Sequence, residues 1–298
     1  MTSIKSAADV AKEKLTTGPK TKKYEKKGAS LAEGVADWFK VMVYGFSGTG
    51  KSYGIGQLAE AGYKLAGIST DFGGNGLGSV ISYLQKRKPE ALKNVLNVDL
   101  QTYDEVIDFC DEPEEFFPGL YDFDPDILFF DGFTSFQMTA LTDQVSEEIT
   151  AKQKDGDESN EAGLRFEFLD WGKIRSGTIK VLNKFLNIHN KKTGRHWSKY
   201  VTCLKDKAKE DKLTGQVTRG PLIQGAAYSI ITAGFDVIME SSSKMSKDGD
   251  ESGNRKYIYT TGGHDKLVAK TRGIEIASVV DADMAKIFKL LNEQLKVK

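Results

Sequence analysis

A glycine-rich segment of eight residues constrains the fold of this chain more than any other feature. It has the pattern G-x-x-x-x-G-K-S and consists of Gly45, Phe46, Ser47, Gly48, Thr49, Gly50, Lys51 and Ser52. The apolar run 41–44 precedes it, and residues 53–61 are suited to a helix. Strand, loop and helix in this order are the context that a phosphate-binding P-loop requires. We therefore expect the chain to bind a nucleoside triphosphate.

The residue types of this loop match the chemistry of a phosphate site. Glycine lets the backbone turn its N–H groups toward phosphate oxygens without a Cβ in the way. We expect Lys51 to reach the β- and γ-phosphates and Ser52 to give its hydroxyl to Mg²⁺. A chance match in a glycine-rich turn is the alternative, and the flanking strand and helix argue against it.

Composition and length predict one large domain with a tail. The chain has 298 residues, of which 39% are hydrophobic and 28% charged, with 42 basic and 42 acidic side chains. Residues 1–37 are rich in lysine and poor in large apolar side chains, which predicts a basic arm before a core at 38–298. The absence of a long apolar run argues against a membrane span, and we expect a cytoplasmic protein.

Apolar runs separated by helical segments predict an α/β fold with a mostly parallel central sheet flanked by helices. The runs that we expect to be strands are 41–44, 64–69, 95–98, 127–130, 200–204 and 235–239. A long helix is predicted at 165–188, after a polar loop at 143–163. The polar segment 241–254 predicts the tip of a C-terminal β-hairpin extension.

Two acidic residues follow predicted strands and could complete a catalytic site. Asp131 comes directly after the apolar run 127–130, where P-loop hydrolases carry the acid on the Mg²⁺ side. Asp71 follows the strand at 64–69 and is the candidate for orienting or deprotonating the attacking water. Each could instead be an ordinary residue that starts a turn.

Further polar residues are weaker candidates for contact with phosphate. Thr202, Cys203 and Lys205 end the strand at 200–204, so we expect them at the same edge of the sheet. Lys270 and Arg272 come late in the chain, where a cation could reach a phosphate in its own site or in that of a neighbouring subunit. The alternative is that these two cations lie on a surface strand.

Charge is segregated along the chain despite the zero net charge. Residues 104–126 contain ten carboxylates and no Lys or Arg, whereas 184–219 contain ten basic and three acidic residues. Within the basic segment, residues 189–200 interleave cations with Trp197 and Tyr200, a pattern that suits single-stranded DNA. A solvated connection between a helix and a strand explains the same residues equally well.

The order of these elements resembles the RecA-like ATPases, and more closely the phage nucleotide-binding protein family of compact RecA-like proteins associated with single-strand annealing. Besides the P-loop and Asp131, the resemblance rests on the segments 170–172, 219–225 and 270–272. It implies ATP and Mg²⁺ as cofactors, a homo-oligomer and action on single-stranded DNA in phage recombination, annealing or replication. The location would then be the host bacterial cytoplasm.

One departure from the family suggests an alternative. RecA relatives carry a catalytic glutamate at the place of Asp71. The shorter acid would lie further from the attacking water, so either turnover is slow or another residue acts as the base. The enzyme implied by the resemblance is an ATPase that is slow or stimulated by DNA. The alternative function is a nucleotide-gated scaffold that switches a protein partner with little involvement of DNA. Lys51, Asp71, Asp131 and Arg272 are the catalytic candidates, with Ser52 and Asp131 on the metal.

Overall fold

The computed structural model describes most of the predicted core. The described residues are 38–71, 76–143, 145–146, 168–207, 209–210, 217–223, 227–245, 255–262, 269–272 and 275–296. The predicted arm at 1–37, most of the polar loop at 143–163 and the hairpin tip at 246–254 lie outside these residues.

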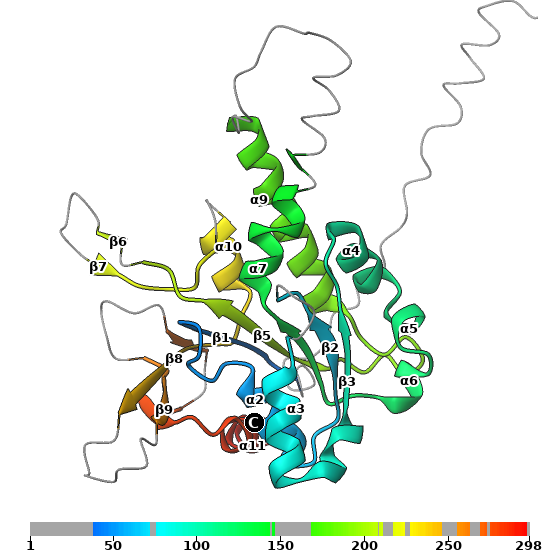
Figure 1. Ribbon diagram of the computed structural model, residues 1–298, viewed down its shortest axis with the longest axis vertical. Coiled ribbons are helices and arrows are strands. Elements are labelled where there is room, and N and C mark those ends of the chain that lie inside the picture. The colour runs from blue at the N-terminus through cyan, green and yellow to red at the C-terminus, as the bar shows by residue number, and fades with distance from the viewer. Residues whose placement is uncertain are drawn as a thin grey trace, which may run out of the picture. The chain divides into compact units, whose positions relative to one another are not determined.

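Six parallel strands form the centre of a mixed, nine-stranded sheet (Figure 1). In spatial order they are β3 (Val95–Asp99), β2 (Leu65–Ser69), β4 (Ile127–Asp131), β5 (Ser198–Leu204), β1 (Lys40–Gly45) and β8 (Val237–Met245). Each predicted strand is present, and all but β8 lie within two residues of their expected bounds. The carboxyl ends of these strands therefore lie along one edge of the sheet.

Antiparallel strands extend the sheet beyond β8. Strand β9 (Arg255–Thr260) pairs with residues 240–245 of β8, and β11 (Val279–Asp281) pairs with β9. The short β10 (Lys270–Thr271) pairs with the first two residues of β8. This region confirms the expected C-terminal β extension. It also explains why β8 runs to Met245 instead of ending at 239, because its second half pairs with β9. A separate hairpin joins β6 (Lys209–Glu210) and β7 (Val217–Thr218).

Helices cover both faces of the sheet. One face packs against α2 (Tyr53–Glu60), α3 (Gly78–Arg87) and α11 (Met284–Lys296). The 3₁₀ helix η1 (Pro89–Asn94), which follows α3 in the chain, belongs to the same layer. The other face packs against α4 (Tyr103–Asp111), α6 (Leu120–Phe123), α7 (Phe133–Met138), α9 (Phe168–Asn187) and α10 (Ala227–Ala233), with α5 (Pro113–Phe116) between α4 and α6. Figure 1 shows these two groups of helices on opposite sides of the strands.

The alternating direction of side chains along each strand explains this burial on both faces. In β1, Val41 and Val43 point into one core, and Met42 and Tyr44 point into the other. Successive side chains of a strand face opposite sides, so a strand buried on both faces must be apolar at every position. Strand β4 is likewise buried along its whole length. The continuous apolar runs of the sequence thus encode a parallel sheet between two helical layers.

Local signals set the start of helix α4. The Thr102 hydroxyl accepts a hydrogen bond from Glu105 N–H at 3.2 Å, and the Glu105 carboxylate accepts one from Thr102 N–H at 3.0 Å. This reciprocal capping satisfies two backbone donors that a helix start leaves free.

Among the described residues, every helix is too short or too polar to cross a lipid bilayer.

Candidate functional site

The glycine-rich loop connects β1 to α2 at the carboxyl edge of the sheet. Gly48 and Gly50 have φ values of 75° and 87°, in the left-handed region that L side chains rarely adopt. Ser241 on β8 donates a hydrogen bond to Thr49 O at 2.6 Å, which ties the loop to the neighbouring strand. Ser52 precedes α2 without capping it through its side chain. The N–H groups of Gly54 and Ile55 already donate to Lys51 O and Ser52 O at 3.2 and 3.0 Å, so an anion would rely on N–H groups of the loop before them.

Lys51 lies across this loop. Its Nζ donates to Gly45 O at 3.1 Å and to Phe46 O at 2.8 Å. Burial lowers the pKa of Lys51, while the negative charges of Asp131 and Asp71 act in the opposite direction. The ammonium is thus held by neutral carbonyl oxygens, and a phosphate oxygen would be a stronger acceptor for it.

Asp131 ends strand β4 and is completely buried in the same region. Its Oδ1 accepts a hydrogen bond from the Thr202 hydroxyl, which itself accepts one from Gly132 N–H at 2.9 Å. Oδ2 is buried and has no hydrogen-bond partner among the described residues. Burial raises the pKa of Asp131 to about 6, although the hydrogen bond from Thr202 and the charge of Lys51 lower it.

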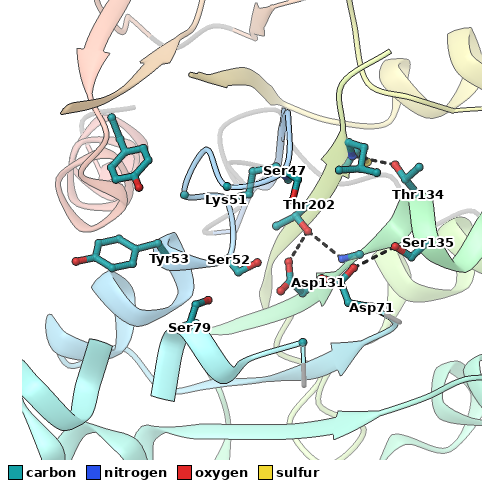
Figure 2. A pocket seen from close by; sticks show the side chains of 17 residues that line it. Ser47, Lys51, Ser52, Tyr53, Asp71, Ser79, Asp131, Thr134, Ser135 and Thr202 are labelled. Carbon is teal, nitrogen blue, oxygen red and sulfur yellow. Dashed lines mark hydrogen bonds between the residues drawn. The ribbon is translucent and has the colours of Figure 1, made fainter. Parts of the chain in front are cut away.

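This arrangement fits a divalent cation. A buried carboxylate oxygen without a partner is costly, and a bound cation would satisfy it. Ser52 faces Asp131 in Figure 2, so a hydroxyl and a carboxylate oxygen point toward a common place. Mg²⁺ typically takes one or two protein ligands and completes its shell with phosphate oxygens and water. Accordingly, the described residues contain no cluster of three or more acidic, histidine or cysteine ligands.

Asp71 lies at the same edge, just beyond β2. Ser135 on α7 donates a hydrogen bond to Asp71 Oδ1 at 3.1 Å. Gly132 has a φ of 89°, and a Cβ at this position would lie 2.6 Å from Asp71 Oδ1. A side chain at residue 132 would therefore have to displace the Asp71 carboxylate from its present position.

These groups surround one pocket of about 590 Å³ (Figure 2). The pocket is lined by residues of the P-loop, of the strand ends and of α3, α7 and β9: Ser47, Gly48, Gly50, Lys51, Ser52, Tyr53, Asp71, Gly76, Ser79, Asp131, Gly132, Thr134, Ser135, Thr202, Cys203, Leu204 and Tyr257. The structure thus brings together residues singled out from sequence, namely Ser47, Gly48, Gly50, Lys51 and Ser52 of the P-loop with Asp71, Asp131, Thr202 and Cys203.

Lys205 does not line this pocket, although it follows Leu204 directly. Its side chain is buried and forms an ion pair with Glu240. Its Nζ lies 5.2 Å from the centre of the Phe46 ring. Phe46 itself is 60% exposed and does not line the pocket. Cys203, by contrast, lines the pocket as expected, and burial raises the pKa of its thiol to about 12.

Lys270 and Arg272 lie away from the pocket. Strand β10 pairs with Val237 and Ile238, at the amino-terminal end of β8, whereas the P-loop lies beside Ser241. Lys270 donates to the carbonyl oxygen of Ala233 at 3.1 Å, and Arg272 donates to the same oxygen at 3.2 Å. The structure therefore does not place Arg272 at the pocket of its own chain, and a role in a neighbouring subunit stays a prediction.

The basic segment faces the acidic segment. Ion pairs join Lys184 to Asp111, Lys191 to Glu112, Lys192 to Asp122, and Arg195 to both Asp124 and Asp126. Trp197 and Tyr200 are fully buried. The expectation that these two aromatic side chains stack on DNA bases is therefore wrong for this structure. The local charge segregation of the sequence becomes mutual neutralisation in the fold.

Several pocket residues were not singled out from sequence. Thr134 and Ser135 follow Asp131 closely, so the hydroxyl pair just past an acidic strand end was a signal that could have been used. Tyr53 directly follows the P-loop. Tyr257 lies about 200 residues away on β9, and nothing in its local sequence marks it as part of a site.

Comparison with known proteins adds no family to this description. No protein-family model matches the chain, and no curated protein matches its sequence.

Proposed function

We propose that this protein is a Mg²⁺-dependent ATPase of the RecA-like P-loop type. The observation that carries the proposal is the convergence of the P-loop with Asp131. Its buried Oδ2 has no hydrogen-bond partner in the described part of the chain, and Lys51 and Ser52 line the same pocket. A pocket of about 590 Å³ is within the range that binds ligands of nucleotide size. The central strand order, with the P-loop strand inside a parallel sheet, is compatible with this class.

In this proposal each residue has a separate task. The loop N–H groups and Lys51 bind the phosphates, and Ser52 and Asp131 would hold the cation. Bound Mg²⁺ would neutralise charge that develops on the phosphate oxygens. Thr202 orients the Asp131 carboxylate through their hydrogen bond. Asp71, held by Ser135, orients the attacking water and accepts its proton.

Action on single-stranded DNA and assembly into a homo-oligomer are part of the same proposal, carried by the family resemblance. The contact site within residues 189–200 loses its support, because these cations are paired with acidic residues. Lys207 is an exposed cation near the carboxyl edge and is the best remaining contact in the described part.

The alternative, a nucleotide-gated switch for a protein partner, draws on one specific observation. Ser135 donates to Asp71 Oδ1, so this short acid is engaged by the protein as well as being available to water. A base held in this way would favour slow turnover, and slow turnover is what a nucleotide switch needs.

The test measures ATP binding and steady-state hydrolysis with Mg²⁺, with and without single-stranded DNA. The proposal predicts that Lys51→Ala abolishes binding, and that Asp131→Asn keeps weak binding but loses Mg²⁺-dependent turnover. Lys289→Ala, on the exposed face of α11, is the matched control and should behave as wild type. ATP binding without turnover would favour the switch, and DNA-stimulated turnover would favour the RecA-like function. Absence of ATP binding at millimolar nucleotide would refute both.

A further inference from the structure

The pocket extends beyond the phosphate-binding loop to two tyrosines from distant elements. Tyr53 is the first residue of α2, and Tyr257 lies on β9 in the antiparallel extension. Neither belongs to the P-loop motif or to the acidic edge. Aromatic side chains at the rim of a polar pocket are suited to a planar, uncharged part of a ligand.

The spacing of the two rings suits a flat group between them. Their centroids are 6.4 Å apart and their planes are inclined by 32°. An aromatic ring in contact with both faces needs about 7 Å, which is twice the usual carbon–carbon contact distance. The observed separation is slightly smaller than this, so a base between the rings would have to displace the half-buried Tyr257 outward.

Tyr53 is held in place from behind. Its ring packs edge-on against Tyr83 of α3, with centroids 4.2 Å apart. The Tyr83 hydroxyl donates to the Glu60 carboxylate, and the Arg87 guanidinium lies 5.4 Å from the Tyr83 ring centre. An aromatic ring that is already oriented loses little conformational entropy when a ligand stacks on it.

Tyr257 lies against the P-loop on the other side. A Cβ added to Gly50 would lie 3.3 Å from the Tyr257 ring. In Figure 2, Ser52 lies between Tyr53 on one side and Asp131 on the other. The acidic edge marks the end of the pocket where hydrolysis is proposed, so Tyr53 lies toward the other end of the pocket, with the Tyr257 ring 6.4 Å from its own.

We infer that Tyr53 and Tyr257 form a slot that binds the nucleobase by stacking. The inference rests on the proposed nucleotide site and adds to it the residues that recognise the base. Stacking accepts every base because each has a π-face, and it favours the larger purines. The slot thus gives the site a preference for purine nucleotides, because their rings have the larger area.

The experiment compares a ligand that has a base with one that lacks it. Titration calorimetry with Mg²⁺ uses a non-hydrolysable ATP analogue and inorganic tripolyphosphate, on wild type, Tyr257→Ala, Tyr257→Phe and Lys51→Ala. Tyr257→Ala loses one stacking partner, so its affinity for the ATP analogue should fall about five- to 150-fold. Tripolyphosphate should bind Tyr257→Ala within about twofold of wild type, and Tyr257→Phe should resemble wild type with both ligands.

The outcomes separate the slot from the phosphate site. If Tyr257→Ala lowers the affinity for both ligands by the same factor, then Tyr257 only supports the loop at Gly50, and the inference is overturned. An unchanged affinity for the ATP analogue would overturn it too. Lys51→Ala should weaken both ligands. If wild type binds neither ligand, the nucleotide site itself fails, and the slot fails with it.

A series of bases gives a second, independent measurement. Wild type should bind the purine triphosphates more tightly than the pyrimidine triphosphates, and Tyr257→Ala should lose most of this preference. A purine preference of the same size in both proteins would place the base elsewhere and overturn the assignment.

Discussion

Replacing Asp131 by asparagine is expected to stabilise the metal-free protein while abolishing its Mg²⁺-dependent function. The carboxylate is fully buried, and burial raises its pKa from 3.8 to about 6. Each pKa unit corresponds to about 1.4 kcal/mol, so the ionised side chain costs the folded protein about 3 kcal/mol at neutral pH. Asparagine removes this charge and keeps an oxygen that can accept the hydrogen bond from Thr202.

The pH dependence of the free energy of unfolding shows the direction of this effect. Between pH 4 and 6 the folded protein keeps a proton on Asp131 that the unfolded chain has lost, so the stability of wild type falls as the pH rises. The variant lacks this loss. The stability of Asp131→Asn relative to wild type should therefore exceed zero only slightly at pH 4 and reach its full difference above about pH 6.5.

The assay is urea unfolding with a chelator at pH 4.5 and at pH 7.5, followed by thermal unfolding at pH 7.5. A gain of about 3 kcal/mol corresponds to about 6 to 12 °C in Tm for a domain of this size. Asp71→Asn is the control, because Asp71 is only half-buried and should show no comparable gain. The same concentrations of Mg²⁺ and ATP should stabilise wild type more than Asp131→Asn, which binds ATP only weakly. A variant that is no more stable than wild type at pH 7.5 would refute the reasoning.

Three further changes test other parts of the structure. Thr202→Val removes the hydroxyl that links Asp131 to a backbone N–H, and should lower ATP turnover about tenfold while circular dichroism stays unchanged; full activity would contradict a positioning role. Asp124→Ala leaves an indole N–H, an amide and a guanidinium without their shared acceptor, and should cost about 2 to 4 kcal/mol in urea unfolding, more than the exposed Asp122→Ala. Burial lowers the pKa of Lys199 to about 7, so wild-type stability should rise by up to about 1.4 kcal/mol per pH unit from pH 7 to 10, and Lys199→Met should remove this slope.

The parts of the site that are local in sequence could be predicted. The P-loop is one continuous segment, and Asp131 ends a strand that is recognisable because it is apolar at every position. The carboxyl ends of parallel strands meet at one edge, so the proximity of Asp71 to Asp131 also followed from fold class. Predictions of this kind need only the strand pattern and the chain direction.

Contacts between distant segments could not be predicted in the same way. The hydrogen bond from Thr202 to Asp131 spans 71 residues, and the one from Ser135 to Asp71 spans 64. Such pairs depend on strand register and on side-chain orientation, which one sequence does not specify. Tyr257 illustrates the same limit, because its approach to Gly50 follows from the pairing of β9 with β8.

The basic segment shows how a charge pattern can mislead. Its lysines and aromatic residues have the composition of a nucleic-acid surface, but composition does not reveal which segment lies opposite. The fold places the acidic helices against it and buries Trp197. The distance of Arg272 from the pocket of its own chain has a related reason, because its position depends on which end of β8 pairs with β10.

The hydrogen bond from Ser241 to Thr49 has a consequence for communication across the molecule. Ser241 belongs to β8, whose second half pairs with β9, so the loop that would hold the phosphates and the antiparallel extension share one strand. Any ligand that changes the position of this strand changes the free energy of the loop as well. Thermodynamic linkage makes this effect reciprocal. If a partner that binds the extension changes the affinity for nucleotide by a given factor, then nucleotide changes the affinity for that partner by the same factor.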